Sequence, residues 1–200
     1  MALTLIKEDG TGRTDANSYA TAAEADAYFE GHLYASAWTA ATATTKASAL
    51  VMATRLVDSQ YQFNGFRAHD TQALQWPRER WPDPDPDRNL VTASTLSPML
   101  TNFVPSTAVP QGVAAAVCEM ARELLIVDRT ASPPGEGIDS VATAHATHAA
   151  TGTGSDSTSS TTKYDKSDTR RIISRVAQAM LSKYGALIEG GSGSVRLVRA

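Results

Sequence analysis

Histidines, aspartates and one cysteine are the side chains of this chain that could do chemistry. His145 and His148 stand three residues apart, a spacing that can hold a metal ion. No carboxylate or cysteine joins them, so we interpret them as solvent-facing polar residues and keep a metal site as the weaker alternative. Asp83, Asp85 and Asp87 alternate with prolines and could offer oxygens to calcium. Alternating prolines keep a chain extended, however, which favours a stiff exposed loop.

The motifs of common enzyme classes are absent from the sequence. It contains no Gly-rich phosphate loop between a strand and a helix, no Gly-x-Ser-x-Gly and no His-Glu-x-x-His. The four histidines fall in expected loops or helix ends without an obvious carboxylate partner. Cys118 is the only cysteine, so it forms no intrachain disulfide, and its apolar surroundings predict a buried, inert thiol. We therefore expect a non-enzymatic protein that needs no cofactor and no metal.

Length and composition fit a modest helical domain. The chain has 200 residues, of which 42% are hydrophobic, and much of that fraction is alanine, which fills helix interfaces. The net charge is −3, but the last third is basic, which keeps nucleic acid open as a partner. Against that partner, no aromatic residues alternate with the arginines of the last helix. No signal peptide or membrane span is evident, so we expect a soluble protein from a reducing compartment.

Four amphipathic stretches predict four helices, near residues 22–32, 46–60, 110–130 and 169–184. Thr21 and Glu24 form a capping box for the first, Thr44 or Thr45 can cap the second, and Pro110 suits the first position of the third. The helix at 110–130, with Leu124 on its apolar face, should be the most buried. Asp168 is expected to cap the last helix and Gly185 to end it.

The connections between these helices carry strong local signals. Residues 2–6 predict a short N-terminal strand. Asn64-Gly65 predicts a turn after the second helix, and Trp76-Pro77 predicts a packed corner that holds the indole against that helix. Residues 140–169 hold 14 serines or threonines, which fits either a flexible loop or a β-hairpin.

The expected fold is therefore mainly α: a small four-helix bundle with a short N-terminal strand, a Ser/Thr-rich hairpin or loop and an extended C-terminal tail. We divide the chain into a helical core (1–132), the Ser/Thr-rich segment (133–167), the final helix (168–189), and a flexible linker with a tail (190–200). The tail alternates apolar and basic residues behind a Gly-Ser linker. It either frays or docks on a partner.

Three stretches together resemble a known family. They are Ala16-Asn17-Ser18-Tyr19 through Tyr28-Phe29, then Gln72-Ala73-Leu74-Gln75-Trp76-Pro77-Arg78, and the end Arg196-Leu197-Val198-Arg199-Ala200. In order and spacing they resemble the head-to-tail connector (adaptor, head-completion) proteins of tailed bacteriophages, some of which carry the label "DnaT-like single-stranded-DNA-binding protein". The Pro-Asp loop and the Ser/Thr-rich segment depart from that pattern in length.

The resemblance implies a structural virion protein at the neck, made in the host cytoplasm, which forms a ring that joins the portal to the tail. The ring would have twelve copies if its symmetry follows that of the portal. The implied partners are the portal protein, a tail or stopper protein of the neck, and other copies of this chain. DNA would only pass through the lumen, and no membrane is involved. The alternative is a single-stranded-DNA-binding accessory protein of replication.

The adaptor interpretation assigns roles to two sets of residues. The first is expected to dock on the portal, and the second to anchor the packing of the core. The docking set is Val195, Arg196, Leu197, Val198, Arg199 and Ala200, and the anchor set is Tyr28, Phe29, Trp76, Pro77 and Leu124.

Overall fold

The computed structural model describes residues 3–83, 103–131, 140–146, 157–163 and 171–188. These residues fall into two compact units, Met1–Asp128 with Ile173–Ala200, and Arg129–Ile172. The helices are α1 (Ala22–Phe29), α2 (Ser36–Thr39), α3 (Ala43–Gln60), α5 (Gln111–Ile126) and α6 (Arg175–Leu181). The strands are β1 (Tyr61–Phe63), β2 (Phe66–Arg67), β3 (Arg78–Glu79), β4 (Ser140–Ala146), β5 (Ser157–Lys163) and β6 (Gly185–Leu187).

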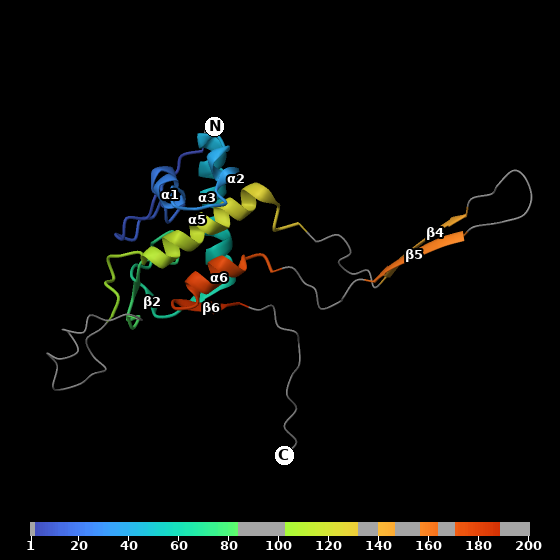
Figure 1. Cartoon of the computed structure of the whole chain (residues 1–200). Helices are drawn as coiled ribbons and strands as arrows, with labels where there is room; N and C mark the ends of the chain where they lie inside the picture. The colour runs from blue at the N-terminus through green and yellow to red at the C-terminus, as the bar shows by residue number, and fades with distance from the viewer. Residues whose placement is uncertain (1–2, 84–102, 132–139, 147–156, 164–170, 189–200) are drawn as a thin grey trace, which may run out of the picture. The chain divides into compact units, whose positions relative to one another are not determined.

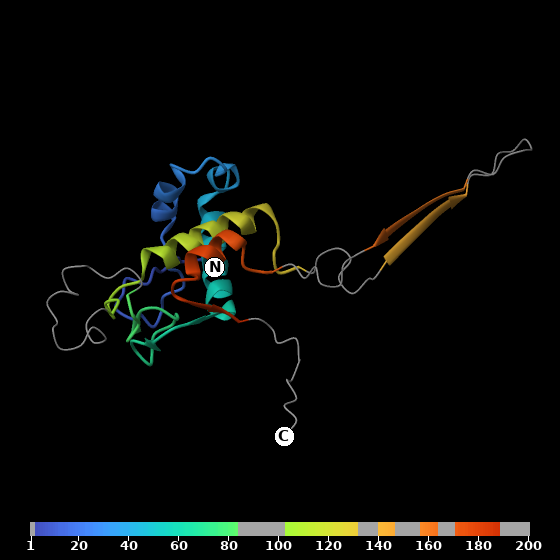
Figure 2. The same cartoon turned by 60° about the horizontal axis from the view of Figure 1, so that its bottom comes forward.

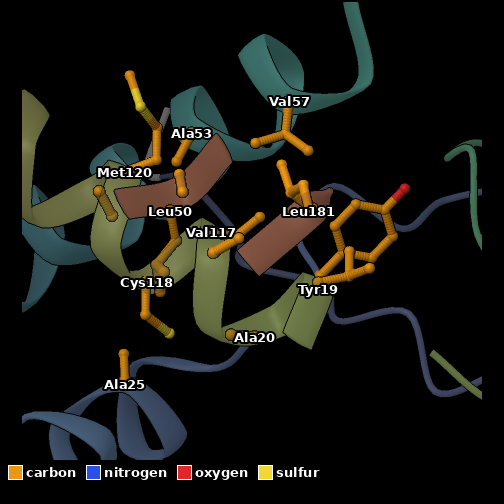
Figure 3. Packing of buried hydrophobic residues seen from close by; sticks show 14 of the residues in the cluster. Tyr19, Ala20, Ala25, Leu50, Ala53, Val57, Val117, Cys118, Met120 and Leu181 are labelled. Carbon is orange, nitrogen blue, oxygen red and sulfur yellow. The ribbon is translucent and has the colours of Figure 1, made fainter. Parts of the chain in front are cut away.

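The first unit is a helical core built around α5, which packs against α3 and α6 (Figure 1). In both views α1 lies on one side of α5 and α6 on the other (Figure 2). The close-up shows Leu50 and Val57 of α3 meeting Val117 of α5 and Leu181 of α6 (Figure 3). These four side chains are fully buried. Alanines at the interfaces let the helices approach closely, as the composition predicted.

Small sheets connect distant parts of the chain. β1 pairs antiparallel with β6, so that Gln62 stands opposite Ala186, and β2 pairs with β3. Gly65 turns the chain between β1 and β2 with φ of 75°, which L side chains rarely adopt. A Cβ there would also lie 2.5 Å from the carbonyl oxygen of Glu79. The Asn64-Gly65 turn is therefore fixed to glycine by both conformation and space.

The second unit contains one antiparallel hairpin. β4 and β5 pair over seven residues, from Ser140 opposite Lys163 to Ala146 opposite Ser157. Of the two predictions for the Ser/Thr-rich segment, the hairpin is therefore confirmed in its strands. Residues 147–156, the expected loop between them, lie outside the described part of the chain.

The mainly α prediction is confirmed in outline, because the four longer helices pack together with the short α2. The capping box also forms: the Glu24 backbone N–H donates to Thr21 Oγ1 (3.1 Å), and the Thr21 N–H donates to Glu24 Oε2 (2.8 Å). α2 was not predicted. It buries Trp38, whose indole N–H donates to Asp26 Oδ1 at 2.7 Å.

Several predicted boundaries were wrong. The helix placed at 169–184 within the 168–189 segment begins only at Arg175, with Ser174 as its cap, and Asp168 lies outside the described residues. Gly185 does not end that helix but opens β6, because the chain there pairs with β1. α3 starts three residues early with Thr42 as its cap, and Pro110 caps α5 from outside.

The predicted N-terminal strand is also wrong. Residues 3–6 form no strand, and Lys7 makes only an isolated parallel bridge with Ser18. The Asn17 side chain takes the place of strand pairing here: its Oδ1 accepts the Ile6 N–H (2.8 Å), and its Nδ2 donates to the Thr4 carbonyl oxygen (2.8 Å). Glu8 is fully buried, and its side chain accepts backbone N–H bonds from Gly10, Gly12 and Arg13, each at 2.9 Å. These bonds fold residues 8–13 into a loop directly after that segment.

Candidate functional site

The Tyr19 and Trp76 motifs of the sequence meet in one buried junction, although 57 residues separate them. The Tyr19 hydroxyl accepts the backbone N–H of Trp76 (3.1 Å) and donates to Asp58 Oδ1 of α3 (2.7 Å). Asp58 Oδ2 accepts the backbone N–H of Gln75 (3.0 Å). One hydroxyl and one carboxylate thus fasten the N-terminal segment, α3 and the Trp-Pro corner together.

Burial changes the acid–base behaviour of this junction. It raises the pKa of Asp58 to about 6, against the hydrogen bonds from Tyr19 and Gln75 that favour the charged form. The pKa of the fully buried Tyr19 is also raised, first by burial and then by the nearby Asp58. No solvent reaches the Tyr19 side chain, so a substrate cannot reach it either. The junction therefore acts as a structural clamp.

The titration of Asp58 gives a testable pH dependence. Its pKa in the folded protein lies above its ordinary value of 3.8, so the folded protein holds this proton more tightly than the unfolded chain. The resulting stabilisation is complete below about pH 4 and is lost as the pH rises through 6. We expect the stability of the wild type to fall over this window, relative to Asp58→Asn, by up to about 3 kcal/mol. Urea denaturation at pH 4.5, 5.5 and 7 measures this, and parallel curves would contradict it.

Trp76 fills the centre of the junction. Its side chain is fully buried, its ring centroid lies 5.7 Å from that of Phe63, and that of Tyr184 is 6.0 Å away, both edge to face. The peptide bond to Pro77 is cis. The indole Nε1 has no hydrogen-bond partner among the described residues. The indole thus contributes through packing, and its ring cannot stack on a ligand.

Arg78 follows the cis proline, and its buried guanidinium is surrounded by backbone carbonyl oxygens. Its guanidinium donates to the carbonyl oxygens of Asn64 (2.8 Å), Phe63 (3.1 Å), Gly65 (2.7 Å) and Gln75 (3.1 Å). Arg78 as a whole residue is only 7% exposed, and this burial lowers the pKa of its guanidinium. The fifth N–H of the guanidinium donates to Gln75 Oε1 (3.1 Å), so Arg78 has no donor left for a phosphate or a carboxylate of a ligand.

A second polar cluster surrounds Glu119 of α5, which is 2% exposed. Its carboxylate accepts the Tyr28 hydroxyl (3.0 Å) and lies 3.1 Å from Arg122 Nε and 3.2 Å from His32 Nε2. The prediction that the histidines lack a carboxylate partner was therefore wrong for His32. Local sequence cannot show this pair, because His32, which follows α1, meets α5 only through the tertiary fold.

A groove of about 750 Å³ opens beside this cluster, between α1 and the first half of α5. Small residues make up most of its lining, together with two tyrosines, Tyr28 and Tyr184. Lys7 and Glu24 form an ion pair and also line it. The small lining residues are Ala20, Ala27, Gly112, Ala114, Ala115 and Cys118. Burial raises the pKa of the Cys118 thiol to about 12, as expected for an unreactive cysteine.

All five expected anchor residues contact the core, but their side chains are buried to different degrees. Phe29, Trp76 and Pro77 are buried, whereas Tyr28 and Leu124 are only partly so. Leu124 therefore packs against the edge of the core, and its truncation should cost less than that of a fully buried leucine. The anchor roles stay predictions until stability is measured. The six docking residues of the tail, 195–200, lie outside the described residues.

The remaining predictions concern metal ligands, the basic last helix and membrane helices. Among the described residues, no three His, Cys, Asp or Glu side chains gather as a metal site would require. His145 lies in β4, and His148 falls outside the described residues, as do Asp85 and Asp87. Arg175 of α6 is exposed. In the described part of the chain, no helix is both long and apolar enough to cross a membrane.

Comparison with known proteins supplies one assignment. The sequence model of a family described as "Putative DnaT-like ssDNA binding protein" matches residues 3–200. The chain belongs to this family. No curated protein and no solved structure gives a match.

The DnaT-like family description directs attention to exposed aromatic and basic side chains. Phe66 of β2 is 63% exposed, and Arg67 beside it and Arg80 after β3 are exposed as well. Base stacking needs such aromatic faces, and phosphate binding needs such cations. However, Glu79 stands directly opposite Phe66 in the β2–β3 pair. Phe66, Arg67 and Arg80 are one candidate set for single-stranded DNA among the described residues, and the Arg67 guanidinium already donates to the Gln72 carbonyl oxygen.

Proposed function

We propose that this DnaT-like family member is a structural adaptor of a phage neck, a ring that joins the portal to the tail. The observation that carries the proposal is the buried junction. Tyr19, Trp76 and Arg78 belong to the motifs that resemble connector proteins, and all three side chains are used up in holding the core together. Residues used in this way build a scaffold, and a scaffold is what a ring subunit needs.

In this proposal the parts of the chain have separate tasks. The helical core contacts neighbouring copies in the ring, twelve if it matches the portal, and DNA passes only through the lumen. Val195–Ala200 dock on the portal, where a ring multiplies one weak contact many times. A tail or stopper protein binds below. The protein works in the virion neck after assembly in the host cytoplasm, with no catalytic step and no cofactor.

Truncation after Gly190 tests the docking step. The shortened protein should keep its helical circular-dichroism spectrum, because α6 and β6 end before the cut. It should lose co-sedimentation with portal assemblies, whereas the full chain co-sediments and forms rings visible by electron microscopy. A chain with Val195, Leu197 and Val198 changed to serine keeps the length and charge of the tail and controls for them. Equal co-sedimentation of all three proteins would rule out docking through the tail.

The second candidate is single-stranded-DNA binding, and the family description favours it directly. Exposed Phe66 beside Arg67 and Arg80 is the surface that fits it. A labelled oligothymidine should then bind with an affinity that falls as salt rises. Phe66→Ala should weaken binding, because base stacking contributes about 1–3 kcal/mol per base. Fluorescence anisotropy measures both, and Leu33→Ala, which removes another exposed apolar side chain, is the matched control.

A further inference from the structure

The groove between α1 and α5 lacks large side chains of its own. Ala27 of α1 lines it, as do Ala114 and Ala115 of α5. Gly112 lets the ring of Tyr184 lie against the helix, since a Cβ there would come within 2.8 Å of that ring. Helices that pack for stability alone fill such a space with larger residues. About 750 Å³ of mostly apolar groove is room for several aliphatic side chains.

The chain leaves this groove at Tyr184, four residues before the last described residue. β6 follows and carries the chain along β1 to Ile188, about 13 Å from Tyr184 at the rise of a strand, where the Ile188 N–H donates to the Gln60 carbonyl oxygen (2.7 Å). Twelve residues follow in the sequence. Residues 189–194 alone can span about 20 Å when extended. The apolar residues of the tail therefore start within reach of the groove.

We propose that Val195, Leu197 and Val198 of the tail occupy this groove in the same copy of the chain. Their side chains match its apolar lining. Arg196 and Arg199 lie between or beside them in sequence and stay at the mouth, where half of the Glu24 side chain is exposed and can accept a further donor. The occupant is thus a short apolar-basic peptide supplied by the chain itself, and the tail would have to leave before it could bind another protein.

Ala115 makes the proposal directly testable, because it lines the groove from a partly exposed position, whereas the thiol of Cys118 is buried. In the full-length variant Ala115→Cys/Cys118→Ala/Leu197→Cys, copper–phenanthroline should oxidise the two introduced thiols to a disulfide within one chain. The matched control adds Val195→Ser and Val198→Ser to these three changes, so tether length, charge and cysteines are the same. We expect disulfide formation at least ten times faster with the apolar residues present, and a product that runs as a monomer on a non-reducing gel.

Other outcomes are informative as well. Equal rates in the two variants would overturn the proposal, and a dimeric product would place the tail in the groove of another copy and overturn the intramolecular form. Adding Ala114→Phe fills the groove from another partly exposed position and should slow the disulfide without loss of helical signal. No slowing would count against the groove as the site. None of these measurements needs a portal, so their failure is distinct from failure of the adaptor proposal.

Discussion

Trp76→Ala is expected to lower the free energy of unfolding by about 3–5 kcal/mol, one of the two largest losses for a single change in this chain. The side chain is fully buried between Phe63 and Tyr184, so its removal forfeits aromatic contacts from both neighbours and leaves a cavity. Tyr184 comes from the chain after α6. The cavity therefore weakens the attachment of the C-terminal segment as well as the corner itself.

Urea denaturation followed by circular dichroism measures this loss. Trp76→Phe keeps an aromatic ring and should recover a large part of it. Trp81→Ala is the matched control, because Trp81 is only partly buried at the edge of the core. If Trp76→Ala cost less than about 1 kcal/mol, or no more than Trp81→Ala, Trp76 would not be the centre of the junction.

Arg78→Met is expected to cost about 3 kcal/mol or more. The change removes the donors that satisfy the carbonyl groups of Phe63, Asn64, Gly65 and Gln75, and each buried acceptor left unpaired costs about 1–3 kcal/mol. Methionine keeps much of the aliphatic packing, so the loss reports mainly on these bonds. Arg78→Lys keeps the charge but lacks the planar fork of donors, and should recover less than half of the loss.

Arg55→Met provides the control for Arg78. Arg55 lies exposed on α3, and its replacement should change stability by no more than about 0.5 kcal/mol. Chemical denaturation of the three variants under one set of conditions gives the comparison. Full recovery by lysine would mean that charge alone holds the corner, which would contradict the role of the hydrogen bonds.

The sequence predicted the features that depend on neighbouring residues. The Thr21–Glu24 capping box, the Asn64–Gly65 turn and the stripe of α5 follow from short-range rules, and all three form. Trp76 was expected at a packed corner because Pro77 restricts it, and it is buried there. The hairpin was one of two open alternatives, since Thr-rich segments have β propensity but little to bury.

The features that the sequence could not show depend on distant residues. The clamp of Tyr19 on Asp58 and Trp76, the pair of His32 with Glu119, and the role of Gly185 all join segments far apart in the chain. Gly185 has the usual signature of a helix end. It lies in a strand instead, opposite Phe63. A Cβ there would come within 2.4 Å of the Gln62 carbonyl oxygen, so glycine is needed for this strand pairing. Tertiary contacts decided these positions over local propensity.

The pairing of β1 with β6 has a consequence for how the protein is made. Ile173, Ala177 and Leu181 complete the core, yet the ribosome adds them only after the whole hairpin unit. A nascent chain that has reached Asp128 therefore exposes the surfaces of α3 and α5 that these residues later cover. Closing such a long loop is slow compared with forming local contacts. The protein should consequently acquire protease resistance in one step, once residues 173–187 have emerged from the ribosome, and not gradually during synthesis.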